Sequence, residues 1–371
     1  MKPINVLQDI YSWVVDSKGL FTVNRDRNIG VISTLAGDLI TPYYSESKLS
    51  PPSCSLETKG VYWVRDTKKS SIIYSDNQFQ KKDYTVDSMF KDYAYIVTKE
   101  KDRATANLNI NTDKIYWHKH PAFSPLSITA DFCFHGYYQL TTLNNKTGEE
   151  LWTYILPDTF NFIDFTSKKQ TASISKILGV YKDNVWLLIS NGSLLALNIK
   201  TGLQSAHIIS PSFAKSFNSE RQQNIKKHID KNNYGIFNNS SDNVQLDVDK
   251  GVIFGFPYQS YAEVDLNDPN YPFTLWDIKD TLEDQKETDK PGFDSLKVGA
   301  WEENDVYVYD SFFDSNRFGV FDRTTRKIRW SEYFEGEDEG WGAIQDLKYA
   351  KGHLYIHAKV DKSLHIYKLE K

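Results

Sequence analysis

Histidines come closest, among the side chains of this sequence, to a spacing that could bind a metal. His118 and His120 are two residues apart, so on a strand they would share one face and offer half of a site. A zinc site needs up to four ligands in a defined geometry. His353, His357 and His365 near the C-terminus lack a cysteine or acid cluster at a recognised spacing. We therefore expect surface or core histidines and no metal.

The acidic stretches resemble no catalytic or calcium-binding motif. Asp310 and Asp314 lie near Asn316, but the segment lacks the acid spacing, the glycine and the closing glutamate of a calcium loop, so we expect a loop between two strands. Acids in flexible loops are usually solvated, whereas acid–base catalysis needs fixed carboxylates. The chain has neither a G-x-S-x-G motif nor a Walker loop. We expect no catalytic residue and no cofactor.

The composition favours a β-rich protein with a substantial core. Of the 371 residues, 40% are hydrophobic and 14% aromatic, and aromatic residues favour strands. The net charge of −5 makes a nucleic-acid binder an unfavoured class, although it suits a basic protein partner. Cys54 and Cys133 are too few for a disulfide framework. Neither a signal peptide nor an apolar run of membrane-spanning length is recognisable, so we expect a cytoplasmic protein without a membrane partner. The composition, rich in Lys, Asn, Asp and Tyr, hints at a bacterial source.

One short pattern recurs along the chain, and Leu143–Pro157 (LNNKTGEELWTYILP) shows it most completely. Counting from Leu143, the pattern has Asn or Asp at +1, usually Thr at +4, Gly at +5 in two of the five copies, and Trp at +9. Asn and Thr side chains hold a turn by bonding nearby backbone, and glycine takes a positive φ without steric cost. The pattern recurs from four other starting residues: Leu108, Leu197 (with Ala206 in place of Trp), Val264 (with three extra residues) and Phe321. We predict that the tryptophans fill the gaps between neighbouring sheets; they are Trp117, Trp152, Trp276 and Trp330.

The spacing of the hairpins predicts a β-propeller. Each pattern follows two short strands, and the chain holds eight such hairpins at a mean spacing of about 46 residues, which is typical of four-stranded blades. The pattern resembles the repeat of the PQQ-like propeller family, L-x-A-L-[DN]-x-x-T-G-x-x-x-W, most closely at Leu194–Gly202 and Leu143–Trp152. The resemblance is good from about Met89 onward and poor before it. It implies an all-β propeller.

The resemblance does not extend to the family's enzymes. Its quinoprotein dehydrogenases are exported, bind calcium and carry adjacent cysteines near the cofactor, whereas this chain has no recognisable export signal and no adjacent cysteines. We therefore expect a non-enzymatic member, with residues 1–371 forming one propeller domain.

The last repeat unit lacks its outer strand, so we expect a strand from the N-terminus to close the ring. Ile4–Val15 is the candidate, paired with Leu364–Leu369 and with Trp13 in place of the missing repeat tryptophan. The count predicts eight blades. Seven is the alternative, because the unit at Lys59–Asp76 and the next one are only about 32 residues apart.

Four long insertions all fall between the outer strand of one blade and the inner strand of the next, and these connections share one face of a propeller. They are Leu156–Gln170, Pro211–Asn243, Asp277–Asp294 and Tyr333–Gly342. The second contains a predicted short helix at Ser219–Lys231. Inserted loops gathered on one face usually mark a binding face.

We interpret the chain as a protein-binding propeller that acts through this face. Acidic loops would steer a basic partner and aromatic residues would anchor it. Stand-alone acidic bacterial propellers of this kind look like immunity proteins that neutralise a toxin. The alternative is a ligand-binding, carbohydrate-binding or enzymatic propeller with a site at the central channel. The expected partner-binding residues are Phe160, Phe162, Phe165, Glu335, Glu337, Asp338, Glu339 and Trp341.

Overall fold

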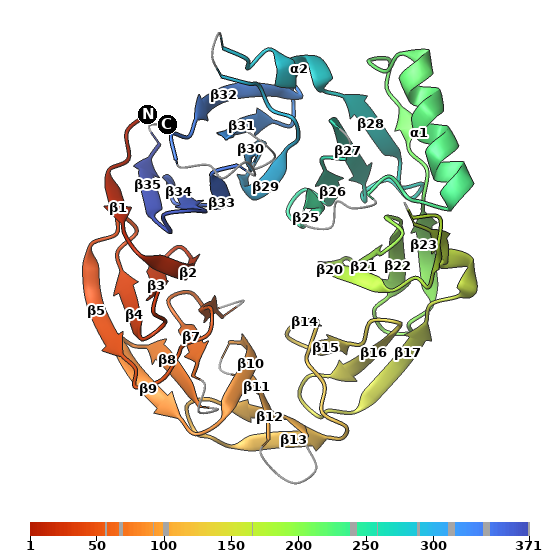
Figure 1. The fold of residues 1–371 in the computed structure, drawn as a ribbon. Helices are drawn as coiled ribbons and strands as arrows, with labels where there is room; N and C mark the ends of the chain where they lie inside the picture. The colour runs from red at the N-terminus through yellow and green to blue at the C-terminus, as the bar shows by residue number, and fades with distance from the viewer. Residues whose placement is uncertain are drawn as a thin grey trace.

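The chain forms an eight-bladed β-propeller, a closed ring of four-stranded antiparallel sheets around a central opening (Figure 1). The computed structural model describes residues 1–55, 58–66, 70–91, 93–98, 104–164, 166–237, 243–257, 259–287, 290–310, 316–336 and 342–369. The predicted fold and the count of eight are confirmed, and the alternative of seven is wrong. The second and third blades are close in sequence because only two residues link them.

Each blade runs from an inner strand at the channel to an outer strand at the rim. Blades 1 to 4 are β2 (Ile10–Val15), β3 (Leu20–Asn24), β4 (Ile29–Ser33), β5 (Leu39–Tyr44); β6 (Ser53–Cys54), β7 (Tyr62–Arg65), β8 (Ser71–Ser75), β9 (Gln78–Lys82); β10 (Thr85–Phe90), β11 (Tyr93–Val97), β12 (Thr105–Asn109), β13 (Ile115–Lys119); and β14 (Ser127–Ile128), β15 (Phe132–His135), β16 (Gln139–Asn144), β17 (Glu150–Ile155). Blades 5 to 8 are β20 (Ile174–Tyr181), β21 (Asn184–Ile189), β22 (Leu194–Asn198), β23 (Gln204–Ile208); β25 (Gln245–Asp247), β26 (Val252–Gly255), β27 (Ser260–Asp265), β28 (Phe273–Asp277); β29 (Lys297–Glu302), β30 (Asp305–Tyr309), β31 (Arg317–Asp322), β32 (Lys327–Tyr333); and β33 (Ile344–Ala350), β34 (His353–Ala358), β35 (Leu364–Lys368), β1 (Asn5–Leu7).

The elements outside the four-stranded pattern all lie in the insertions. They are the helix η1 (Asp158–Phe160), the hairpin β18 (Phe162–Ile163) and β19 (Lys169–Gln170), strand β24 (Ser212–Phe213), and helices α1 (Ser219–Asn232) and α2 (Lys279–Glu283). Strand β24 pairs parallel with β28 and gives blade 6 a fifth strand. No helix in the described ranges is both long and apolar enough to cross a membrane.

The middle strands are apolar runs because blades pack face to face and bury both sides of these strands. In β22, for example, the side chains from Leu194 to Leu197 are all buried. The core is therefore distributed between blades around the ring. The blades form a stiff frame that leaves variation to the loops.

The ring closes through the N-terminal strand, as predicted, but the segment Ile4–Val15 divides into two strands. β1 pairs antiparallel with β35, with Asn5 opposite Ile366 and Leu7 opposite Leu364. The chain then turns at Asp9, whose φ is 57°, and continues as β2, the inner strand of blade 1. Trp13 lies on β2 and packs against Tyr355 with ring centroids 5.8 Å apart. The prediction that Trp13 replaces the missing repeat tryptophan is therefore wrong.

The repeat motif forms turns by the expected mechanism. The side-chain oxygen of Asn144 accepts backbone N–H bonds from Lys146 and Thr147 at 2.9 and 3.1 Å. Gly148 follows with a φ of 71°. A β-carbon at Gly148 would lie 2.6 Å from the indole of Trp117 in the preceding blade. The turn glycine therefore serves both a positive φ and close packing between blades.

The repeat tryptophans join neighbouring blades, as predicted. Trp152 is buried, its Nε1 donates to the carbonyl of Ile199 at 2.8 Å, and it packs against Gly202. In the repeat with arginine in place of glycine, the Arg326 guanidinium lies 4.0 Å from the ring centroid of Trp276. Trp152 and Trp276 thus each contact the repeat turn of the next blade.

Candidate functional site

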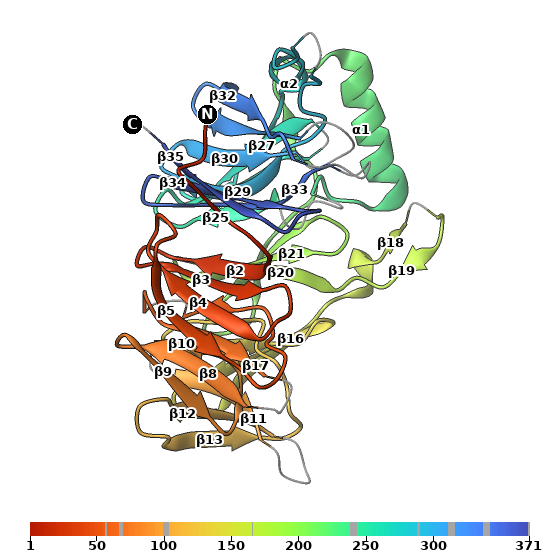
Figure 2. The same cartoon turned by 60° about the vertical axis from the view of Figure 1, so that its left-hand side comes forward.

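The four insertions emerge together on one face of the ring. They connect β17 to β20, β23 to β25, β28 to β29, and β32 to β33, each an outer strand to the next inner strand. Because the strands of a blade alternate in direction, these connections all open on the same side. Figure 2 shows α1 and the β18–β19 hairpin projecting from that side. We call this set of loops the insertion arc.

The first insertion folds on to the ring through Phe160. Phe160 is only 2% exposed and packs with the buried residues Ala172 and Ile174. Its ring lies 4.1 Å from that of His207 on β23. The prediction that Phe160 is exposed is wrong, because η1 turns this side chain toward blade 5. Phe160 therefore holds the insertion in place and is not an exposed anchor.

The hairpin at the tip of the first insertion carries Phe162, which is partly buried. Its ring lies 5.5 Å from that of Tyr234, just beyond α1. The turn of the hairpin is held by Asp164, whose carboxylate accepts bonds from the Thr166 hydroxyl at 2.6 Å and from the Lys168 backbone at 2.9 Å. These bonds lower the pKa of Asp164 to about 2. Phe165 lies outside the described residues.

The second insertion contains α1, which confirms the predicted helix. Asn218 caps its N-terminus by accepting the backbone N–H of Arg221 at 2.7 Å. Ile229 is the side chain of α1 that enters the core cluster as a buried residue. The helix ends at Asn233, which adopts a left-handed conformation with φ 55°.

Specific side-chain contacts join the insertions into one surface. Asn233 Nδ2 donates to the carbonyls of Thr159 and Asn161 at 2.9 and 2.8 Å, which ties the second insertion to the first. An ion pair between Arg221 and Asp277 ties the second to the third.

Lys290 completes the chain of contacts, since it lies 3.4 Å from Glu335 and so ties the third insertion to the fourth. The arc is thus a continuous surface over four blade junctions.

The third insertion is fixed to blade 7 by a buried arginine. Arg317 is 1% exposed, and its guanidinium donates to the Pro291 carbonyl at 2.5 Å and to Glu287 at 3.0 Å. Asp310, considered above as part of a calcium loop, is fully buried and accepts the backbone N–H groups of Asp294 and Ser295 at 2.6 and 2.8 Å. Asp310 thus secures the end of this insertion.

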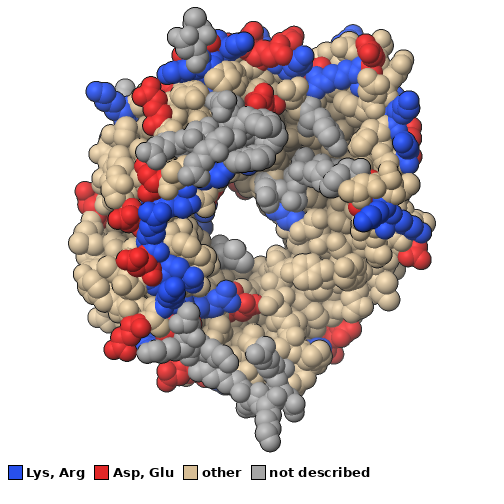
Figure 3. All heavy atoms as spheres, in the orientation of Figure 1, with Lys and Arg blue, Asp and Glu red and all other residues tan. Residues whose placement is uncertain are grey.

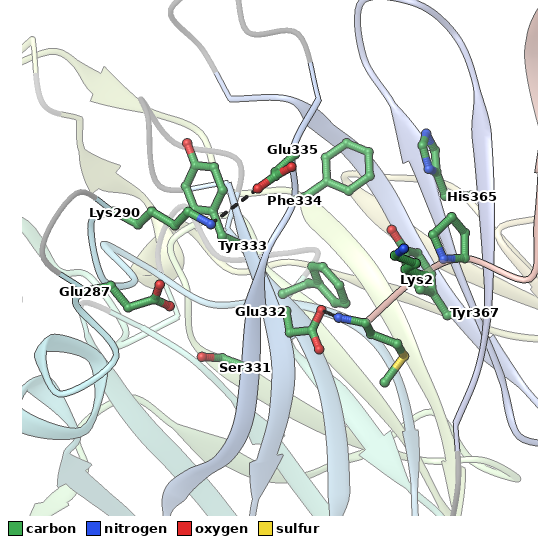
Figure 4. A pocket seen from close by; sticks show the side chains of 13 residues that line it. Lys2, Glu287, Lys290, Ser331, Glu332, Tyr333, Phe334, Glu335, His365 and Tyr367 are labelled. Atoms are coloured by element: carbon green, nitrogen blue, oxygen red, sulfur yellow. Dashed lines mark hydrogen bonds and ion pairs between the residues drawn. The ribbon is translucent and has the colours of Figure 1, made fainter.

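A pocket of about 460 Å³ lies where the third and fourth insertions meet blade 8 (Figure 4). Side chains of both charges line it, among them Lys2, Glu287, Lys290, Glu332 and Glu335. The pocket suits a polar partner surface better than an apolar ligand.

The fourth insertion begins with a buried phenylalanine that forms one wall of the same pocket. The ring of Phe334 meets that of His365 edge to face at 4.9 Å. Burial lowers the pKa of His365.

The acidic residues predicted for partner binding are only partly described. Glu335 is exposed and pairs with Lys290. Glu337, Asp338, Glu339 and Trp341 lie outside the described residues, so their predicted role stays a prediction. The charge of this region follows from the sequence, because the third and fourth insertions hold eleven acidic residues against three basic ones.

Sequence reasoning missed two highly exposed aromatic residues of the insertion face. Tyr137 and Tyr138, in the loop between β15 and β16, are 59% and 65% exposed, and neighbouring Ile155 is 69% exposed. The Tyr138 carbonyl accepts from Leu156 at 3.3 Å, which places the pair beside the first insertion. Exposed tyrosines are frequent anchors in protein interfaces. The signal that could have revealed them is the pair of adjacent tyrosines shortly before the repeat that starts at Leu143.

The histidines considered as metal ligands do not converge. His118 and His120 are exposed, whereas His357 is buried with Nε2 2.9 Å from the Ile10 carbonyl. Across the part of the chain that the structure describes, no three His, Cys, Asp or Glu side chains gather as a metal site would require.

Comparisons with solved structures place the fold among β-propellers. The chain is similar to BamB from Moraxella catarrhalis (10% identity, TM-score 0.55, 99% of both chains) and to the C-terminal WD40 domain of Sif2 (10% identity, TM-score 0.61, 100% of this chain and 98% of that one). It is also similar to the computationally designed protein Ika8, with 11% identity and a TM-score of 0.56 over the whole of both chains. At these identities the likeness shows the fold alone.

Neither protein-family models nor curated protein sequences gave a match to the chain. The resemblance to the PQQ-like family therefore has support at the level of fold only. One fold serves many functions, so this likeness assigns no role to the chain.

Proposed function

We propose that this chain is a non-enzymatic, cytoplasmic propeller that binds another protein through its insertion arc. The main support is that contacts of Asn233, Arg221 and Lys290 join the four separate insertions into one surface. Loops that served only to connect strands would not need such contacts. The exposed Tyr137 and Tyr138 supply anchors beside the arc.

We further propose that the chain is a bacterial immunity protein that neutralises a toxin. The acidic third and fourth insertions would meet the basic surface of a toxin that acts on nucleic acid, which accelerates association and covers the toxin's active site. This proposal is tested by the neighbouring gene. A toxin encoded there should kill cells that lack this protein and spare cells that produce it.

The binding face is tested by charge reversal at the fourth insertion. Glu335, Glu337, Asp338 and Glu339 are replaced together by lysine, and association with the partner is measured at low and high salt. The matched control reverses four exposed acids at turns on the opposite face: Asp131, Glu149, Asp183 and Glu303. We expect slower association for the first variant alone. Equal rates for both variants, or a partner docked on the opposite face, would contradict the proposal.

A further inference from the structure

The first two insertions differ in charge from the other two. Five exposed lysines lie on the hairpin and on α1: Lys168, Lys169, Lys226, Lys227 and Lys231. Figure 3 shows that Lys and Arg side chains lie near α1, with Asp and Glu side chains among them. None of the five makes an ion pair with another described residue, whereas the nearby Asp164 is occupied by its own turn.

A groove of about 360 Å³ separates the hairpin from the C-terminal end of α1. Lys169 stands on the hairpin wall and Lys231 on the helix wall. The other lining residues add amide and hydroxyl groups, one carboxylate and two apolar side chains: Asn161, Asn232, Asn233, Ser167, Asp230, Phe162 and Ile163. Two ammonium groups face one carboxylate, so the groove carries a net positive charge, whereas the amide N–H groups of Asn161, Asn232 and Asn233 already donate to neighbouring oxygens.

The walls of this groove are held in position before any partner binds. Asn233 bonds the end of α1 to the first insertion, and Phe162 packs against Tyr234. The hairpin turn is fixed through Asp164. Preorganised walls lose little conformational freedom on binding, which favours recognition of a partner segment.

We propose that this groove binds a short acidic segment of the protein partner, in which carboxylates alternate with an aromatic or aliphatic side chain. Lys169 and Lys231 would pair with the carboxylates, and Phe162 and Ile163 would contact the apolar side chain. The insertion arc is thus bipolar, because it presents lysines at one end and acids at the other.

The arc's own charge argues against a nucleic acid in this groove. A nucleic acid needs a continuous basic track along its phosphates. Here the ion pair of Arg221 with Asp277 joins α1 to the third insertion. The third insertion is acidic and would repel a longer polyanion. A short carboxylate segment would stay within the groove, between the hairpin and the C-terminal end of α1.

The inference rests on the proposed protein-binding function, and its test uses a defined peptide instead of the unknown partner. The probe is a short fluorescent peptide of alternating glutamate and phenylalanine, compared with the same peptide carrying glutamine and with single-stranded oligothymidine. Titrations are followed by fluorescence anisotropy on the full chain at low and high salt. Failure here would leave the charge-reversal test of the fourth insertion unaffected.

The decisive variant is Lys169→Glu with Lys231→Glu, and the matched control is Lys114→Glu with Lys327→Glu, at exposed repeat turns on the opposite face. We expect the first pair of substitutions to weaken binding of the glutamate peptide by about tenfold or more in Kd. The control pair should leave this Kd unchanged. Ile163→Ser should also weaken binding. Absence of binding, equal affinity for the glutamine peptide, equal effects of both pairs, or tighter binding of oligothymidine would each overturn the proposal.

Discussion

Trp152 shows how one side chain joins two blades. Its indole leaves the outer strand of blade 4, packs on Gly202 of blade 5 and donates to the Ile199 carbonyl there. Replacing Trp152 with alanine opens a cavity and leaves that carbonyl without its donor, so we expect a loss of roughly 3–5 kcal/mol in the free energy of unfolding. Chemical denaturation of the wild-type chain and of the variant measures this loss. Trp301→Ala, at a residue 37% exposed, is the control, and an equal loss there would contradict the assignment.

Buried histidines should make the protein sensitive to mild acid. Burial lowers the pKa of His357 at the junction of blades 8 and 1, where Nε2 faces the Ile10 carbonyl. In the unfolded chain histidine titrates near 6.5, so as the pH falls below about 6.5 the unfolded state takes up a proton first. The free energy of unfolding is therefore fully present above this pH and decreases below it.

The test compares melting temperatures at about pH 7.5 and about pH 5.5. His357→Gln keeps a donor for the Ile10 carbonyl and should reduce the drop in melting temperature. His118→Gln, at an exposed position, should retain the full drop. An identical drop in both variants would contradict this role for His357.

At the scale of elements, the repeat turns could be predicted because their causes are local. Asn144, Thr147 and Gly148 satisfy and shape their own backbone within a few residues. The helix α1 was predictable for the same reason. The burial of Phe160 was not, because it depends on β23 and on blade 5, which are distant in sequence.

The contacts between insertions could not be predicted from the sequence either. Asn233 lies more than seventy residues from its partners Thr159 and Asn161, and no periodicity connects them. The positions of the four insertions were predictable, since any interruption of a regular repeat stands out. Their assembly into one arc required the structure.

Asn233 offers a test of this assembly at the level of elements. Asn233→Gly keeps the left-handed conformation that ends α1 but removes both side-chain bonds to the first insertion. We expect faster amide hydrogen exchange in residues 158–164 and at the end of α1, with the melting temperature of the ring nearly unchanged. Asn267→Gly, at a repeat turn on the opposite face, is the control. Unchanged exchange in the first insertion would show that the two insertions are not coupled.

At the scale of the whole molecule, the ring depends on a contact between its two chain ends. β1 is only three residues long, yet it covers the edge of β35, and β2 follows it directly at the channel of blade 1. An open blade would leave unpaired backbone groups and expose the apolar boundary between blades 8 and 1. That boundary contains Trp13, Tyr355 and Ile366.

Deleting residues 1–7 removes β1 while leaving β2 in place, and it should lower the melting temperature by roughly 5–10 °C. The rate of amide hydrogen exchange should rise most in β35 and β2, because these strands flank the opened edge. Deleting only residues 1–3 keeps β1 and serves as the control. If the longer truncation melts like the full chain, the ring is held by its blade interfaces alone, and the closing strand contributes no stability.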